Sequence, residues 1–140
     1  MSKDPINQTE TIRRILTSVH TIAVEGFSSN PERAWYYVPE YLQSQGYRII
    51  PVNPNLSQAL GERAYPDLGS VPEPFELVLL FRRSEDVQPF VEQAVQLGAK
   101  AVWMQKGIAN QAAAQIARQA GLEVVMDTCM KEQHEEYVRG

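Results

Sequence analysis

The chain of 140 residues carries a net charge of −4, and 44% of its residues are hydrophobic. A chain of this length fits one domain, residues 1–140, with a core that needs no disulfide or metal for stability. The acidic balance argues against a general nucleic-acid binder, which needs a broad basic face, but not against one small anionic ligand. The single cysteine, Cys129, cannot form an internal disulfide. Because residues 1–10 are polar and no apolar run is long enough to span a bilayer, we expect a cytoplasmic protein with no membrane contact.

An amphipathic helix is predicted near the N-terminus, over about residues 8–19. Its apolar residues recur at helical spacing: Ile12, Ile15, Leu16 and Val19. Asn7 with Glu10 three residues later resembles a capping box, which marks a helix start. The β-rich run of residues 22–25 then predicts the first strand.

The loop after this strand begins with four residues suited to an anion: Gly26, Phe27, Ser28 and Ser29. Bare backbone N–H groups at such a strand end can hold a phosphate, and glycine lets a ligand approach them closely. We therefore expect a nucleotide-like ligand at this end of the strand.

The helix that follows has two alternative starts, because Pro39 lacks the N–H that a helix interior needs. Either residues 30–31 cap a helix that kinks near Val38, or the helix begins near Val38 and ends at Gln45. We favour the second alternative, in which residues 27–37 form a long loop.

Three later glycines each stand where a helix would end in a left-handed cap: Gly46, Gly98 and Gly121. Each precedes an apolar run typical of a buried strand, namely residues 47–52, 99–104 and 122–126. A further strand, residues 77–81, follows the turn-rich stretch 53–76.

Helices are predicted between these strands. One opens at Ser84 and another at Asn110, the second covering residues 111–120, while the charged residues 131–140 form a short helix or a frayed tail. Alternating strands and helices of this length favour an α/β fold. We predict a three-layer Rossmann-like arrangement, with a parallel sheet of about five strands flanked by helices.

Small, amide and basic residues follow the later predicted strands: Asn53, Pro54 and Asn55; Phe81, Arg82 and Arg83; Gln105, Lys106 and Gly107. In an open parallel sheet these strand ends lie at one edge, where ligands bind. Arginine side chains match phosphate oxygens, and glycine and serine N–H groups add to them. Arg33 either folds over such a ligand or stays solvated. The edge therefore predicts a phosphate-bearing ligand.

A nicotinamide dinucleotide is the alternative ligand. Its fingerprint has further glycines after the first one and an acidic residue after the second strand. Here Phe27 and Ser28 follow Gly26, and Asn53 takes the acidic position. A standard NAD site is disfavoured, and an oxidoreductase that uses NADP in a degenerate Rossmann site is the alternative function.

A series of segments spans nearly the whole chain after the N-terminal helix: residues 22–28, YRIIPVNP at 47–54, 60–61 with 65–68 and 71–73, 81–83, 102–105 with Gly107, and 126–129. In this order they resemble the small stand-alone CoA-binding domain proteins. That domain is similar to the nucleotide-binding domain of the succinyl-CoA synthetase α subunit. The resemblance implies a Rossmann-like domain that binds coenzyme A.

On the family pattern, residues 26–29 with Asn53 and Pro54 hold the nucleotide. Phe81 with Arg82 and the segment Gln105, Lys106 and Gly107 then close the pocket. The sequence departs from the family pattern at four positions: Glu25, Pro39, Asn55 and Gln133. Glu25 replaces a usual apolar residue and Asn55 a frequent basic one, changes that would weaken or shift ligand binding.

Other candidate residues have structural interpretations. Arg82 and Arg83 are neighbours on an extended segment and point to opposite sides, so we expect Arg82 to face the ligand and Arg83 to pair with a surface carboxylate. Trp103 is expected in the core, and the aromatic residues 35–37 are expected to pack at a helix start. Cys129 has no convincing base partner and is expected to be a buried small hydrophobe.

The favoured hypothesis is a cytoplasmic module that binds CoA or an acyl-CoA at the carboxyl edge of the sheet without transforming it. No catalytic constellation or metal cluster is apparent in the sequence. A regulatory version, in which ligand occupancy exposes a surface for a protein partner, is a further alternative. We expect no nucleic-acid partner.

Overall fold

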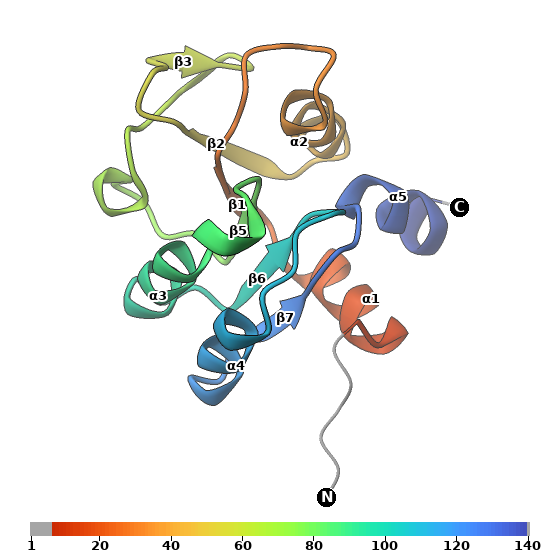
Figure 1. Ribbon diagram of the computed structural model, residues 1–140. Coiled ribbons are helices and arrows are strands. Elements are labelled where there is room, and N and C mark those ends of the chain that lie inside the picture. Colours follow the sequence, from red (N-terminus) through yellow and green to blue (C-terminus); the bar gives the residue numbers. More distant parts are fainter. Residues whose placement is uncertain (1–6, 140) are drawn as a thin grey trace, which may run out of the picture.

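The structure, a computed structural model, describes residues 7–139. Within these residues, five strands form a parallel sheet in the order β2-β1-β5-β6-β7 (Figure 1). Their bounds are β1 Thr21–Glu25, β2 Arg48–Val52, β5 Leu77–Leu80, β6 Ala101–Met104 and β7 Glu123–Val125. The parallel pairing between all neighbouring strands confirms the predicted α/β, Rossmann-like fold.

Helices cover both faces of this sheet and complete three layers (Figure 1). On one face lie α1 (Thr9–Ser18), α2 (Ala34–Ser44) and α5 (Met130–His134), and on the other α3 (Gln88–Gln96) and α4 (Gln111–Gln119). Successive residues of a strand point to opposite faces. In β1, Ile22 and Val24 therefore pack with α1, while Ala23 packs with α3 and α4.

Two side chains have the predicted place in the core. Trp103 is fully buried, and its Nε1 donates a hydrogen bond to the Thr128 carbonyl at 2.8 Å. Cys129 is buried and free, packed in the same core as α1 and α2. Both predictions are confirmed.

The start of α1 differs from the prediction. The N-cap residue is Gln8, whose side chain makes no cap hydrogen bond. The Asn7 side chain instead pairs with the backbone of Met126, donating to its carbonyl at 2.7 Å and accepting from its N–H at 2.8 Å. The predicted capping box is wrong, because this backbone partner beyond β7 takes both hydrogen-bonding groups of the amide.

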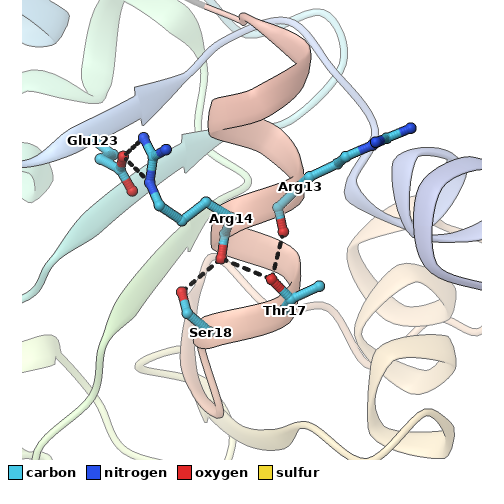
Figure 2. Close-up of polar contacts among 5 residues, drawn as sticks. All are labelled: Arg13, Arg14, Thr17, Ser18 and Glu123. Carbon is cyan, nitrogen blue, oxygen red and sulfur yellow. Dashed lines mark hydrogen bonds and ion pairs between the residues drawn. The ribbon is translucent and has the colours of Figure 1, made fainter.

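Arg14 joins α1 to the first residue of β7 (Figure 2). Its Nε donates to the Glu123 carboxylate at 2.9 Å. In the last turn of α1, the hydroxyls of Thr17 and Ser18 donate to the carbonyls of Arg13 and Arg14 at 2.8 and 2.6 Å. The Arg14 contact holds α1 along the edge of the sheet, and the two hydroxyls find their acceptors within the helix.

α2 begins earlier than predicted. It covers Ala34–Ser44 with Pro39 inside it, so the favoured start near Val38 and the long loop over residues 27–37 are wrong. Proline has no N–H, so the carbonyl four residues before it lacks its helical hydrogen bond. Here that carbonyl accepts a hydrogen bond from another residue, which makes the proline tolerable. That carbonyl belongs to Trp35 and accepts the Ser28 N–H at 3.4 Å.

The remaining elements refine the prediction. Gly46, Gly98 and Gly121 follow helices with positive φ, as predicted. The turn-rich stretch before β5 holds a hairpin that was not predicted, β3 (Gln58–Ala59) with β4 (Glu62–Arg63), and the 3₁₀ turn η1 (Leu68–Ser70). Ser84 opens another such turn, η2 (Ser84–Asp86), just before α3, and the charged tail is helical through α5 and η3 (Glu135–Arg139). No helix within residues 7–139 has the length and apolarity to cross a membrane.

Candidate ligand-binding site

The strand order creates a topological switch point between β1 and β5. The chain passes from β1 to β2 on one side and then returns to β5 on the other side of β1. In open parallel sheets, a crevice forms beyond the carboxyl ends of the strands at such a point, and ligands bind there. Glu25 ends β1 and Phe81 follows β5, so the loops predicted to bind a ligand begin at this crevice.

A pocket of about 290 Å³ lies at this edge. We call it the carboxyl-edge pocket. Its lining comes from the start of α2, the residues after β5 and the loop after β6: Ala34, Trp35, Phe81, Arg82, Arg83, Gln105, Lys106, Gly107 and Ile108. The structure therefore brings together the predicted site residues that follow β5 and β6. The other predicted residues, Gly26, Phe27, Ser28, Ser29, Arg33, Asn53 and Pro54, lie outside this lining.

Gly26 serves a different purpose from the one predicted. A Cβ on this residue would lie 2.5 Å from the Phe81 carbonyl oxygen, and its φ is +93°. Its N–H donates to the Val52 carbonyl at 3.0 Å. Glycine is therefore required here so that the loops after β1 and β5 can touch, and its own N–H is not available to a phosphate.

The residues after Gly26 are held by neighbouring elements. Phe27 is fully buried, and its carbonyl accepts a hydrogen bond from Asn53 Nδ2 at 2.7 Å. The Asn53 Oδ1 accepts the Asn55 N–H at 2.7 Å, so this side chain shapes the two loops rather than facing open solvent. Ser29 and Pro54 are exposed. Among residues 7–139, no acceptor takes the N–H of Phe27 or of Ser29.

Arg82 is anchored by an acidic partner that sequence reasoning missed. Its Nε and Nη2 donate to Glu25 Oε2 at 2.9 and 2.5 Å, and its guanidinium lies 5.2 Å from the ring centre of Phe90. Glu25 is only 2% exposed. Burial raises the pKa of the Glu25 carboxyl, while the hydrogen bond and charge of Arg82 oppose that shift. Because Glu25 compensates its charge, Arg82 offers the pocket less positive potential than its residue type suggests.

The other cations at this edge are more exposed. Arg83 pairs with Asp86 at 3.1 Å, which confirms its predicted surface carboxylate, although it also lines the pocket. Lys106 Nζ lies 3.9 Å from Glu132, a loose contact between exposed side chains. Such surface pairs are weak and leave most of the cationic charge available to an anion. Arg33 stacks over the Trp35 ring at 6.0 Å.

The loop after β6 is fixed by the loop after β7. The Gly107 N–H donates to Asp127 Oδ1 at 2.7 Å, and the Asp127 N–H donates to the Ile108 carbonyl at 2.9 Å. Asp127 has a φ of 52°, which aspartate tolerates better than most residues. Gln105 is buried, and its Oε1 accepts the Met130 N–H at 3.3 Å. One wall of the pocket is thus preorganised by contacts that sequence reasoning missed.

Four lining residues were not predicted as site residues: Ala34, Trp35, Arg83 and Ile108. The signal for Trp35 was the aromatic run over residues 35–37, which we interpreted as packing. That interpretation holds for Tyr36, whose ring centre lies 5.6 Å from that of Phe27. It is wrong for Trp35, which is 43% exposed at the pocket.

Residues 20–135 match the model of a protein family described as CoA binding domain. The chain belongs to this CoA-binding domain family. The resemblance noted in the sequence is therefore confirmed, and the matched residues include β1 to β7 and every residue that lines the pocket.

The chain is also similar to individual proteins in sequence and structure. Uncharacterized protein YneT of Bacillus subtilis (strain 168) is 38% identical over 123 residues, which are 88% of this chain and 91% of that protein. A hypothetical protein from Pyrococcus horikoshii OT3 has a similar structure, with a TM-score of 0.90, 38% identity and coverage of 99% of both chains. The structure of ID.343 from Thermus thermophilus has a TM-score of 0.87 and 33% sequence identity, and the match covers 93% of this chain and 98% of that one.

Proposed function

We propose that this protein binds coenzyme A or an acyl-CoA at the carboxyl-edge pocket, as a binding or regulatory module that does not transform it. The observation that carries the proposal is the position of the pocket in a CoA-binding domain. It opens beyond the carboxyl ends of β5 and β6, beside the topological switch point where this fold class takes nucleotides.

The start of α2 supplies the first argument for a phosphate-bearing ligand. Ala34 and Trp35 are the first two residues of α2, so their N–H groups belong to the turn that has no helical acceptor. Such a helix end carries partial positive charge, and here it lines the pocket. Lys106 and Arg83 also line the pocket and add charge to the same space.

The apolar part of the lining suits the rest of the ligand. Trp35, Phe81 and Ile108 offer the kind of surface on which an adenine ring or a pantetheine chain packs. CoA is larger than the pocket, so part of it would extend over the neighbouring loop. There the N–H group of the exposed Ser29 would face the pyrophosphate, and Asn53 with Pro54 would form the nucleotide wall.

The acidic groups around the pocket support binding rather than acid–base chemistry. Glu25 is held by Arg82, and Asp127 is held by the Gly107 N–H. A general base must reach a substrate proton with a free oxygen, whereas each of these carboxylates already has a structural contact. The proposal therefore assigns the pocket recognition and assigns no catalytic residue.

Calorimetric titration with CoA, acetyl-CoA, NADP and NAD in parallel tests this function. We expect saturable binding of CoA or acetyl-CoA and none of the nicotinamide dinucleotides. An NADP isotherm with no response to CoA would favour the oxidoreductase alternative and overturn the proposal.

A matched pair of variants tests the location of the site. Lys106 lies just beyond the carboxyl end of β6, and Lys100 lies just before its amino end. Both are exposed. We expect K106A to weaken CoA binding about three- to tenfold, since an exposed ion pair is worth roughly 1 kcal/mol, and K100A to leave it unchanged. Equal effects of the two variants would place the ligand elsewhere.

A further inference from the structure

Pro39 removes one specific hydrogen bond from α2. It is the sixth residue of this helix, so a residue with an N–H at this position would donate to the carbonyl of Trp35, four residues earlier. The proline has no N–H, and its ring crowds that carbonyl and turns it away from the helix axis. The Trp35 carbonyl is therefore left without its helical donor.

That carbonyl is used by the loop after β1. It accepts the Ser28 N–H at 3.4 Å, which links the loop to the first turn of the helix that lines the pocket. Two further bonds hold the preceding residues, from the Gly26 N–H to the Val52 carbonyl and from Asn53 Nδ2 to the Phe27 carbonyl. The Ser28 bond is thus the last of three successive contacts that fix this loop.

We propose that Pro39 is a positioning residue for the ligand loop, because its missing N–H reserves the Trp35 carbonyl for Ser28. The next residue, Ser29, is exposed, and residues 7–139 provide no acceptor for its N–H. Holding Ser28 therefore limits the movement of Ser29 and of the N–H group that Ser29 offers to a ligand. This inference rests on the proposed function for its effect on ligand binding, but not for its effect on the loop.

Two substitutions separate the hydrogen-bonding role of Pro39 from its packing role. P39A and P39V both restore an N–H at position 39. Pro39 is buried, and valine keeps its number of side-chain carbons whereas alanine leaves a cavity. In both variants the new N–H competes for the Trp35 carbonyl, and the helix gains the bond that proline denies it.

Three measurements on both variants test the proposal: amide hydrogen exchange at Ser28 by NMR, the dissociation constant for CoA, and the urea midpoint of unfolding. We expect Ser28 exchange to become about three- to tenfold faster and CoA binding about three- to tenfold weaker, as for the loss of one neutral hydrogen bond. We expect the urea midpoint of P39V to equal or exceed that of the wild type.

Other results would overturn the proposal. Unchanged Ser28 exchange in both variants would show that the proline does not control this bond. Faster exchange with unchanged CoA affinity would show that the bond does not position the ligand. A loss of affinity in P39A that P39V restores would assign Pro39 a packing role. If the wild type does not bind CoA, the proposed function fails, and Ser28 exchange alone still decides whether Pro39 fixes the loop.

Discussion

Arg82 forms an ion pair with the buried Glu25 at the point where β1 and β5 end. Both nitrogen donors of Arg82 contact the same carboxylate oxygen of Glu25, at 2.9 and 2.5 Å. The pairing of Glu25 with Leu80 in the sheet puts Arg82 two residues further along the adjacent strand end. Burial raises the pKa of the carboxyl and so disfavours its charged form, while the hydrogen bond and charge of Arg82 act against that shift.

Removing only one partner of this pair is expected to destabilise the protein more than removing both. R82A leaves a buried carboxylate without its cation and is expected to lower the free energy of unfolding by roughly 2–3 kcal/mol. The double variant E25L/R82A removes the uncompensated charge and is expected to recover at least half of that loss. Urea denaturation of the wild type and both variants measures the difference. If R82A unfolds like the wild type, the pair contributes nothing to stability.

Gly26 and Gly46 make a matched pair for testing the contact between the two loops. Both have positive φ, +93° and +102°, but a Cβ at Gly26 meets the Phe81 carbonyl at 2.5 Å, whereas one at Gly46 meets no atom within 4 Å. G46A is expected to cost roughly 1–2 kcal/mol from backbone strain alone. G26A is expected to cost roughly 2–5 kcal/mol, because overpacking against a backbone adds to that strain. Equal thermal shifts for the two variants would contradict the close approach of the loops.

Asp127 is expected to hold the loop after β6, which forms one wall of the pocket, in its place. D127N keeps an oxygen acceptor for the Gly107 N–H and tolerates the positive φ, while D127A loses the acceptor. We expect faster amide exchange at Gly107 and a loss of roughly 1–2 kcal/mol of stability in D127A, with D127N close to the wild type. Equal protection of Gly107 in the two variants would show that the side chain does not hold this loop.

His134 links α5 to α2 and to the start of β2. Its Nδ1 lies 2.8 Å from the Tyr41 hydroxyl, and its ring meets those of Tyr41 and Tyr47 edge-on, at centre distances of 5.4 and 5.7 Å. Only 4% of the residue is exposed. Burial lowers the pKa of His134 from 6.5, with the charge of Arg139 adding to the shift and that of Glu135 opposing it. The folded protein therefore favours the neutral imidazole.

This shift predicts that the protein becomes less stable as the pH falls. The unfolded chain takes up a proton on His134 near pH 6.5, before the folded protein does, so unfolding is favoured below that pH. The contribution is fully present above about pH 6.5 and is lost as the pH falls toward the lowered folded pKa. Urea unfolding between pH 5 and 8 measures it. H134Q is expected to have a shallower pH dependence than the control H20Q, and identical slopes would contradict this assignment.

Much of the fold was predictable because its signals are local. Apolar runs bounded by glycines such as Gly98 and Gly121 indicated buried strands after helix ends, and the structure confirms them. The alternation of strands and helices then favours a parallel sheet with ligand-binding loops at one edge. From this rule alone, Phe81 and Arg82 were grouped with Gln105, Lys106 and Gly107, and the structure brings them into one pocket lining.

The sequence by itself determined which residues follow each strand, but only the tertiary structure decided what those residues contact. Pro39 and Asn7 show why, because each was interpreted from its neighbours in sequence while its effect depends on a distant backbone group. Because of Pro39, the Trp35 carbonyl has no helical donor and accepts the Ser28 N–H instead. The Asn7 side chain pairs with the backbone of Met126, which is 119 positions away in the chain. Likewise, the partner of Arg82 was set by the register between β1 and β5. Strand ends can be predicted from local sequence patterns because the geometry of a strand is regular along the chain. Hydrogen-bond partners cannot, because they depend on which elements lie side by side in the fold.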